Sequence, residues 1–366
     1  MQRFSHEYDR RLRIGMVGCG QHTMRNILPA LQYAPVELAA TCDLNRQLAE
    51  LVGRQFGSAR AYTDFVEMIG QEGLDAVYMA VSDNPRGSPY PRMAVAAMEA
   101  GVHVWIEKPP ADTLAQAESM ADASRRTGKF LGVGYKRMFL PTAIKAREIM
   151  ASSEFGEVTA FHYTFRLSLR PHGAPVATDL SHPMGLVLGL MGPAETIYFE
   201  RHPRTGSASI SMRFASGALG NIFLEGRPSP NGPAERAIVI GDGAHLEIDN
   251  VIRLTYYRRV SKRGAYGREA SFIGPNEDAP LFWEPEFTLG QLYNKNIFLI
   301  GYVGEVCHFA ESVLDGKAPD RAGAADLIEI MRWTEALHQP SGTLTRLMPA
   351  APASATRPEP AGRGAL

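Results

Sequence analysis

Residues 13–31, RIGMVGCGQHTMRNILPAL, decide how the first third of the chain is interpreted. A short apolar run is followed at once by Gly18 and Gly20, and then by a segment of helical length. Glycines at such a junction let the backbone come close to a pyrophosphate, whose charge the amino end of the helix stabilises. The third small position of the GxGxxG pattern is Thr23, so these residues would also fit a plain turn between a strand and a helix.

The same alternation continues along the next hundred or so residues. From Leu12 to about Lys136, short apolar runs alternate with amphipathic segments, as parallel βαβ units do. This predicts an α/β fold with a Rossmann doubly wound parallel sheet in residues 1–137. Asp43 ends the second apolar run, where a carboxylate can accept ribose hydroxyls and repel the extra phosphate of NADP. The pattern favours NAD as cofactor, and Arg46 either softens that preference or faces solvent.

After Pro141 the pattern changes. One helical segment precedes closely spaced apolar strands, and turns such as Ser216-Gly217, Asp242-Gly243 and Asp249-Asn250 are typical of antiparallel hairpins. We expect residues 138–348 to form an α+β domain for substrate binding and oligomerisation, with a large, mainly antiparallel open sheet and two helices near its end. The tail, residues 349–366, is dominated by Ala, Pro, Gly and charge and is expected to be disordered.

Composition limits the partners. With 38 Lys and Arg against 39 Asp and Glu, the net charge of −1 gives no reason to expect nucleic acid or an anionic membrane. Cys19, Cys42 and Cys307 lack metal-ligand spacing, so we interpret them as buried thiols and expect no metal. No apolar run is long enough to span a bilayer, and the first residues do not look like a secretory signal. We expect a cytoplasmic protein that binds a small molecule.

The stretch HVWIEKPPAD, residues 103–112, places charge at the end of an apolar strand. Ligands of doubly wound sheets bind at the carboxyl ends of strands, where Glu107 and Lys108 are expected. Pro109 cannot donate to a sheet and restricts the residue before it, so Lys108 is held in a defined direction. A positioned ammonium can polarise a carbonyl or stabilise an alkoxide. From this motif alone, a salt bridge at the strand end is an equal alternative.

Taken together, these segments resemble the Gfo/Idh/MocA oxidoreductases, the family of glucose-fructose oxidoreductase and myo-inositol dehydrogenase. The resemblance runs from about residue 12 to 347 and is carried by GMVGCG, ATCD, LDAVYMAVSDN, AAMEAGVHVWIEKPPA, VGYKRMFLP, FGEV, DLSHPMGLVLGLMG and GYVGEVCHFAESVLDGKAP. It implies transfer of hydride between NAD and a hydroxyl or ketone carbon of a sugar, sugar derivative or cyclitol, with Lys108 in catalysis. The family often pairs open sheet faces, so a homodimer or homotetramer is expected.

The family pattern also has an aspartate four residues before a histidine, ahead of a helix that ends in Leu-x-Gly. Counted back from Gly192, the histidine is His182. The aspartate position is Thr178 by strict spacing, while Asp179 lies one residue later, and a further aspartate of the pattern is replaced by Gly185. Either Asp179 takes the role after a local shift, or the carboxylate is lost. A histidine suits the removal of an alcohol proton because its ordinary pKa, about 6.5, lies near working pH.

The remaining candidates are binding residues. The expected cofactor contacts are Gly18, Gly20, Gln21, His22, Asp43, Arg46, Val81, Asp83, Asn84, Glu107 and Lys108. Substrate contacts are expected from GYKRMF, from a loop containing Gly and Pro, and from the catalytic residues: Lys108, Tyr135, Arg137, Arg170, His172 and His182. GYKRMF would equally suit a solvated linker between the domains.

Two other functions stay open at this point. Loss of the aspartates at positions 178 and 185 would suit a regulatory protein that binds NAD without turnover. Some members of the family are glycosidases or lyases that use tightly bound NAD for transient oxidation. Release of the nucleotide separates these from a dehydrogenase, which exchanges NADH in every turnover.

Overall fold

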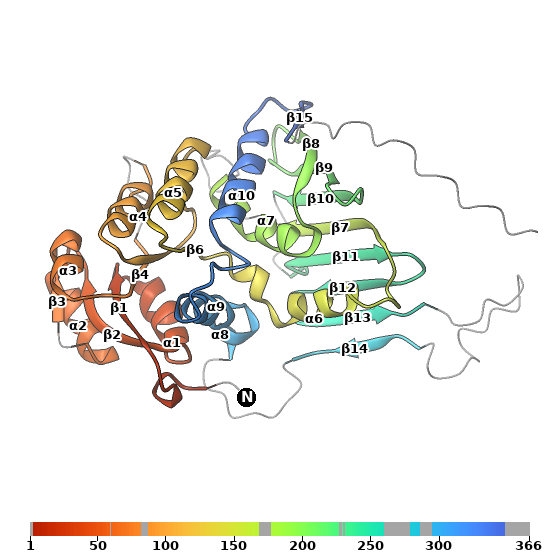
Figure 1. The fold of residues 1–366 in the computed structure, drawn as a ribbon. Coiled ribbons are helices and arrows are strands. Elements are labelled where there is room, and N and C mark those ends of the chain that lie inside the picture. The colour runs from red at the N-terminus through yellow and green to blue at the C-terminus, as the bar shows by residue number, and fades with distance from the viewer. Residues whose placement is uncertain are drawn as a thin grey trace, which may run out of the picture.

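The computed structural model describes residues 3–58, 60–81, 87–167, 177–226, 229, 231–259, 279–285 and 295–347, and of residues 177–179 it describes the backbone. This part of the chain forms one six-stranded and one nine-stranded sheet, which lie side by side with helices between them (Figure 1). A short 3-10 helix, η1 (Ser5–Glu7), precedes the first strand.

The six-stranded sheet is parallel throughout, with the order β3-β2-β1-β4-β5-β6. Its strands are β1 (Leu12–Val17), β2 (Val36–Cys42), β3 (Arg60–Tyr62), β4 (Ala76–Met79), β5 (His103–Ile106) and β6 (Leu131–Val133). The helices between them are the π-helical turn η2 (Thr23–Ile27), α1 (Leu28–Leu31), α2 (Arg46–Phe56), α3 (Phe65–Gln71), α4 (Tyr90–Glu99) and α5 (Leu114–Thr127). The predicted Rossmann fold is confirmed. The strand order reverses between β1 and β4, so the ligand crevice of such a sheet lies at their carboxyl ends.

Polar caps set the starts of the helices that follow these strands. Asn45, Asp64 and Thr113 each accept a hydrogen bond from a backbone N–H in the first turn of α2, α3 and α5, respectively. A capped helix start needs no ligand to satisfy its N–H groups. By contrast, no side chain caps η2 at His22, beside the glycine loop, and α1 and α4 also begin without a side-chain cap.

Helices α3, α4 and α5 cover one face of the Rossmann sheet, and α1 and α2 cover part of the other. The rest of that second face is covered by α8 (Asn296–Leu299) and α9 (Tyr302–Leu314). Tyr78 of β4 donates from its hydroxyl to the Val306 carbonyl at 3.2 Å, and its ring lies 5.6 Å from that of Phe309. We expected α9 to be one of the two helices that complete the second domain, and this expectation was wrong. A parallel sheet needs cover on both faces, and the helices after β4 and β5 lie on the other one.

The nine-stranded sheet has the order β14-β13-β12-β11-β7-β10-β9-β8-β15 and is antiparallel except between β7 and β10. Its strands are β7 (Val158–Arg166), β8 (Ala194–Arg201), β9 (Ala208–Phe214), β10 (Leu219–Glu225), β11 (Glu235–Gly241), β12 (His245–Asp249), β13 (Arg253–Tyr257), β14 (Leu281–Trp283) and β15 (Leu344–Arg346). The large, mainly antiparallel sheet is confirmed, and the three predicted turns join β9 to β10, β11 to β12 and β12 to β13.

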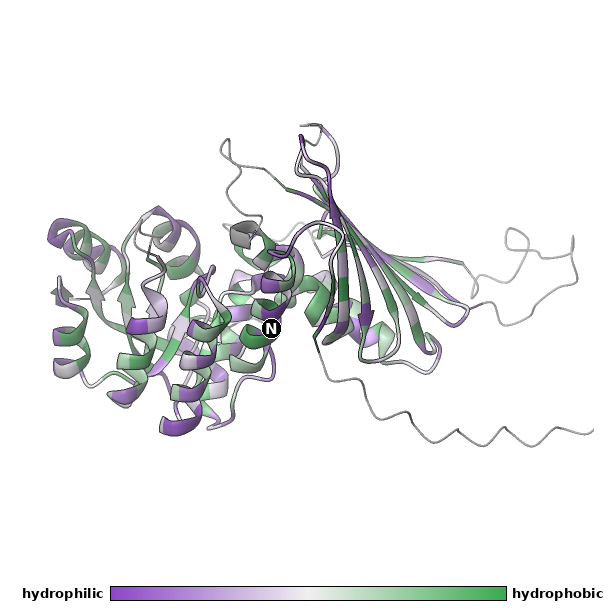
Figure 2. Cartoon of the chain, turned by 90° about the horizontal axis from the view of Figure 1, so that it is seen from above, coloured by the Kyte–Doolittle hydropathy of each residue, from purple (hydrophilic) through white to green (hydrophobic). Residues whose placement is uncertain are grey.

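The two faces of this sheet differ. The helices α6 (Pro141–Met150), α7 (Ala177–Met191) and α10 (Ala324–Ala336) lie on the side toward the Rossmann sheet, and Figure 2 shows no described element on the opposite side. Phe161 and Tyr163 of β7 are buried on the inner face, whereas Leu219, Phe223 and Ile240 are exposed on the outer one. Strand pairing places Leu219 and Ile240 in one row, since both are opposite Ala160. Among the described helices, none has the length and hydropathy to cross a membrane.

The three cysteines are buried thiols, as predicted. Burial raises the pKa of Cys19 to about 12 and that of Cys42 to about 11, and the Asp43 carboxylate adds to both shifts. These two thiols are therefore unreactive at neutral pH, because the thiolate is the nucleophile.

Candidate functional site

The glycine loop presents bare backbone at the carboxyl end of β1. Gly18 has a φ of +87°, and a Cβ there would lie 2.2 Å from the carbonyl oxygen of Ala80. Gly20 is exposed and a Cβ built on it meets nothing within 4 Å, so its backbone is open to the crevice. Thr23, at the third small position, donates from its hydroxyl to the Gly18 carbonyl at 2.6 Å. The threonine closes the loop onto the helix, and the loop fits a pyrophosphate.

Asp43 shapes this loop from the end of β2. Its Oδ2 accepts from the Cys19 N–H at 2.8 Å, and its Oδ1 accepts from the Asn45 N–H at 2.8 Å. A carboxylate has about four acceptor positions, so two remain for the hydroxyls of a ribose. Arg46 pairs with Glu50 at 3.0 Å on the exposed surface. Of the two alternatives for Arg46, the structure thus supports the one in which it faces solvent.

Glu107 joins the glycine loop to the strand that delivers Lys108. The Glu107 side chain is buried, with Oε1 2.7 Å from His22 Nε2 and Oε2 accepting from the Lys108 N–H at 2.9 Å. A Cβ at Gly134 would lie 3.1 Å from Oε2, so β6 approaches the carboxylate closely. The expected pairing at the strand end therefore exists as a hydrogen bond, and it joins Glu107 to His22 rather than to the ammonium group of Lys108.

Lys108 follows β5, which ends at Ile106, two residues before the position that the sequence suggested. Its side chain is half-buried, and the described residues include no ion pair of its ammonium group. The peptide bond between Lys108 and Pro109 is cis. The ammonium group remains available to a ligand.

His182 lies on α7, and the electrostatics place it beside the strand-end lysine. Burial lowers the pKa of His182 well below its usual value, and the charge of Lys108 is the next largest cause, followed by Lys136, Arg137 and His22. At neutral pH the imidazole is therefore neutral, which is the form that accepts a proton. A base on the helix beside one sheet thus lies within the electrostatic range of a cation at the strand end of the other.

The helix carrying His182 begins at Ala177, which corrects our expectation that the histidine precedes the helix. Asp179 lies on the same helix, and its side chain is outside the described part of the structure. A Cβ at Gly185 would lie 3.5 Å from the Cβ of Tyr135. The glycine that replaces the second aspartate of the family pattern therefore packs against the segment GYKRMF.

The segment GYKRMF is largely buried. The alternative that it forms a solvated linker between the domains was therefore wrong. Tyr135 is buried in the core, and its hydroxyl has no hydrogen-bond partner among the described residues. Arg137 forms a buried ion pair with Glu235, which also accepts from the Tyr163 hydroxyl at 2.5 Å. The hydroxyl of Tyr135 and the Nε of Arg137 are buried without a partner among the described residues, so this segment is packed into the protein.

Lys136 donates to the Tyr302 hydroxyl at 2.8 Å, and its Nζ lies 4.1 Å from the centroid of that ring. Burial lowers the pKa of Lys136 to about 8, although Glu305 and Glu107 oppose the shift. The start of α9 can come this close because Gly301 has a φ of +91°, and a Cβ there would lie 2.1 Å from the Lys136 carbonyl oxygen.

Four of the expected binding residues, Asp83, Asn84, Arg170 and His172, lie outside the described residues. Gln21 is exposed beside Gly20. The Val81 N–H donates to the Tyr90 hydroxyl at 3.0 Å, and that hydroxyl donates to the Val81 carbonyl at 3.1 Å, which fixes the end of β4.

Tyr302 and Glu305 were missed at the sequence level. A detectable signal existed, because Glu305 is an ionisable residue on the buried face of the apolar helix YVGEVCHF. The described residues contain no group of three or more His, Cys, Asp or Glu that could hold a metal ion.

Comparison with known proteins agrees with this geometry. Residues 12–135 match the family model described as an oxidoreductase family with an NAD-binding Rossmann fold. The chain is 25% identical over 328 residues to scyllo-inositol 2-dehydrogenase (NAD(+)) of Bacillus subtilis (strain 168), a match that covers 84% of this chain and 86% of the relative. It is 30% identical over 167 residues to D-glucoside 3-dehydrogenase of Escherichia coli (strain K12), covering 45% of each chain.

The fold recurs in an oxidoreductase from Agrobacterium radiobacter solved with NAD+, L-tartaric acid and magnesium. The TM-score is 0.76 at 18% identity, over 92% of this chain and 98% of the other. Fold, glycine loop and family match define an NAD-binding oxidoreductase. The nucleotide-binding part of the chain, residues 12–135, matches this oxidoreductase family, in agreement with the resemblance to the Gfo/Idh/MocA proteins, and NAD is its cofactor.

Proposed function

We propose that this protein is an NAD-dependent dehydrogenase that transfers hydride between NAD and a hydroxyl or ketone carbon of a sugar, sugar derivative or cyclitol. The observation that carries the proposal is that the buried His182 is neutral at neutral pH and lies within the electrostatic range of Lys108, which follows the end of β5. A base and a cation on opposite sides of one crevice suit an alcohol whose oxygen must lose a proton while charge develops on it.

In the oxidative direction, His182 accepts the proton of the substrate hydroxyl, and Lys108 stabilises the oxygen as it becomes a carbonyl. We assign Asp179 to orienting His182. Bound NAD+ would supply the hydride acceptor. Its pyrophosphate would lie at Gly18 and Gly20, and its adenosine ribose at Asp43. In the reductive direction the same groups act in reverse.

The relatives support the substrate class. The proteins matched over most or part of this chain are named as dehydrogenases of scyllo-inositol and of D-glucosides. Both substrates are polyols whose secondary hydroxyl is oxidised, which is the chemistry that a histidine base and a lysine suit. We therefore assign a polyol or a derivative of one to this chain.

The test is spectrophotometric. Purified protein with NAD+ is given cyclitols, aldoses, uronates and, with NADH, keto-sugars, and the NADH absorbance is followed. We expect turnover on at least one member of the panel and a preference for NAD over NADP. No turnover on any member, with NAD bound, would favour a regulatory protein. Nucleotide that stays bound through many turnovers would favour a glycosidase or lyase.

We also propose that the outer face of the nine-stranded sheet pairs with a second copy, to give a homodimer or homotetramer. Leu219, Phe223 and Ile240 expose 54%, 40% and 41% of their surface there, and exposed apolar sheet favours association. Light scattering after gel filtration should give a multiple of 40.0 kDa for the wild type. The variant Leu219→Lys with Phe223→Glu should shift toward the monomer, whereas Val66→Glu, at an exposed site of α3, should not.

A further inference from the structure

A small cavity lies between β5, β6 and α9. Its polar lining consists of Trp105, Glu305, His308 and Arg321, and its apolar lining includes Phe139 and Phe309. The space open to the centre of a water-sized sphere is about 10 Å³, which is room for one water molecule.

Three of these polar side chains lack partners. Both carboxylate oxygens of Glu305, the Nε1 of Trp105 and the Nε2 of His308 are buried without a hydrogen bond in the described part of the chain. Glu305 is only 2% exposed. Buried polar groups without partners are rare and point to an unseen water or to a role in the chemistry. A water in the cavity could accept from the indole N–H and donate to the carboxylate, which satisfies both.

Glu305 also lies within the electrostatic range of the cations of the candidate site. Lys136 and Lys108 stabilise its ionised form, and Glu107 opposes it. Lys136 also lies within hydrogen-bond distance of the Tyr302 hydroxyl, one turn before Glu305 on the same helix. Glu305 therefore stands between the cavity and the lysine whose charge acts on His182.

On the opposite side, His308 leads to the surface. Its Nε2 lies 3.0 Å from Oδ1 of Asp320, a side chain that is 72% exposed, although the two atoms are not aligned for a hydrogen bond. Arg321 and Arg147 are the other charged groups that face this ring. A short path of titratable groups thus runs from the crevice to bulk solvent.

We propose that Lys136, Glu305, one water in the cavity and His308 form a relay that exchanges a proton between the active-site crevice and the surface at Asp320. The proposal rests on the proposed function, because the proton is the one that the substrate hydroxyl releases. As that O–H bond breaks, an N–H bond forms on His182, and hydride leaves the same carbon for NAD+.

The later steps move a proton and no electrons. The proton leaves His182 for the amine form of Lys136. Glu305, which is protonated at rest, passes its own proton through the cavity water to His308 and is reprotonated by Lys136. Bulk water takes the proton from His308 beside Asp320. Each step breaks one N–H or O–H bond and forms another. In the reductive direction the proton enters by the same path.

The protonation equilibria suit such a path. Burial raises the pKa of Glu305 well above its usual value, lowers that of Lys136 to about 8 and lowers that of His308. The ordinary pKa values of a carboxylic acid and an amine differ by about 6. These shifts make the difference between Glu305 and Lys136 smaller. A proton then moves between them at a smaller cost in free energy.

The kinetic test is Glu305→Gln, with Glu311→Gln, at an exposed position of the same helix, as the matched control. We expect kcat of Glu305→Gln to fall about tenfold, less than for loss of the base itself, and the solvent isotope effect on kcat to increase. Adding imidazole buffer should restore most of the rate, since a small proton carrier replaces the relay. The wild type and Glu311→Gln should not respond to buffer concentration.

Wild-type kcat in Glu305→Gln, or a loss of rate that no buffer restores, would overturn the relay. If Glu305→Gln does not fold, His308→Asn is tested in the same way, with the same two outcomes. Failure of the proposed function looks different, because the wild type itself would then turn over no member of the panel.

A second measurement does not depend on activity. A high-resolution crystal structure should show one water between Trp105 and Glu305, and Trp105→Phe should lose it. Infrared spectra at neutral pH should show a protonated buried carboxyl that disappears in Glu305→Gln. An empty cavity together with an unchanged infrared spectrum would contradict the assignment, whatever the kinetics.

Discussion

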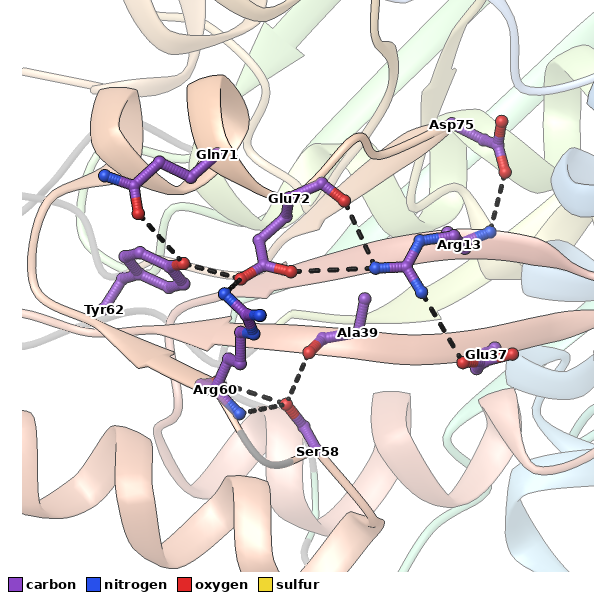
Figure 3. Close-up of polar contacts among 9 residues, drawn as sticks. All are labelled: Arg13, Glu37, Ala39, Ser58, Arg60, Tyr62, Gln71, Glu72 and Asp75. Atoms are coloured by element: carbon purple, nitrogen blue, oxygen red, sulfur yellow. Dashed lines mark hydrogen bonds and ion pairs between the residues drawn. The ribbon is translucent and has the colours of Figure 1, made fainter.

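At the amino ends of the Rossmann strands, charged side chains pair with one another, whereas at the carboxyl ends several keep free hydrogen-bonding capacity. Figure 3 shows the first arrangement. The buried carboxylate of Glu72 accepts from the Tyr62 hydroxyl at 2.6 Å and lies 3.7 Å and 3.4 Å from the guanidinium groups of Arg13 and Arg60. Arg13 in turn donates from its backbone N–H to Asp75 at 2.8 Å.

The carboxyl ends are different. The Lys108 ammonium group forms no ion pair within the described residues, the carboxylate of Glu305 has no partner there, and Gly20 leaves its backbone open. Both ends use the same residue types, so residue type alone does not distinguish a stabilising cluster from a functional one. Unused hydrogen-bonding capacity distinguishes the functional cluster from the stabilising one. It lies where ligands of doubly wound sheets bind.

The largest expected effect is at Lys108. Lys108→Ala should lower kcat by about 10³, because one positioned donor to a developing oxyanion is worth 10²–10³, while the Kd for NAD stays nearly unchanged. Steady-state kinetics and calorimetric titration with NAD+ measure the two quantities. Glu72→Gln, a charge change at the other end of the sheet, should leave kcat unchanged. Lost NAD binding in Lys108→Ala would reassign the lysine to the cofactor.

Next is His182, whose replacement by Asn should reduce kcat/KM for oxidation by about 10² or more, as expected for a lost general base. The pH dependence gives a second readout. The base must be neutral, and its pKa is lowered by burial and by Lys108. The acidic limb of the wild-type kcat/KM profile should therefore fall below the ordinary histidine value of about 6.5. An acidic limb at or above that value would mean that His182 is not the base.

A smaller effect, on stability alone, is expected at the amino ends. Glu72→Ala removes the acceptor of the buried Tyr62 hydroxyl, the ion pair of Arg60 and one of the two ion pairs of Arg13. The midpoint of thermal unfolding should fall by about 2–4 °C, with KM and kcat unchanged at 25 °C. Scanning calorimetry measures the first quantity. A loss of activity in the folded variant would mean that the two ends of the sheet are coupled.

The smallest effect concerns His103, the first residue of β5. Burial lowers its pKa to about 4, with the charge of Lys129 as the second cause, and its Nδ1 accepts from the Phe130 N–H at 2.9 Å. Between about pH 6.5 and 4 the unfolded chain binds more protons than the folded one, so stability falls as the pH falls. The free energy of unfolding, measured with urea, should differ less between pH 7 and pH 4.5 in His103→Gln than in the wild type. An unchanged difference would contradict this origin.

Much of the fold could be predicted from the sequence, because its signals are local. The apolar runs around Gly18 and Lys108 lie within single βαβ units, and the hairpin turns are marked by residues such as Asp242 and Gly243. Strands β3, β8, β14 and β15 were not identified in advance. Strands β3, β14 and β15 have three residues each, which is too short for a period of two to show.

The site was harder to predict where it depends on contacts distant in sequence. Lys108 and His182 could be named from motifs, but the pairing of Glu107 with His22 joins residues 85 positions apart. Tyr302 and Glu305 reach the crevice only because α9 packs on the Rossmann sheet. A helical period predicts that one face is buried, and it does not say against which sheet.

That packing also bears on how the chain is made. Tyr78 and Val306 are 228 positions apart and share a hydrogen bond inside the Rossmann core. Synthesis proceeds from the amino end, and domains that complete their cores early can fold while the ribosome is still working. Here the nucleotide-binding half stays unfinished until more than four-fifths of the polypeptide has been made. Residues 1–137 expressed alone would expose the apolar sheet face that α9 covers, and we expect such a fragment to aggregate.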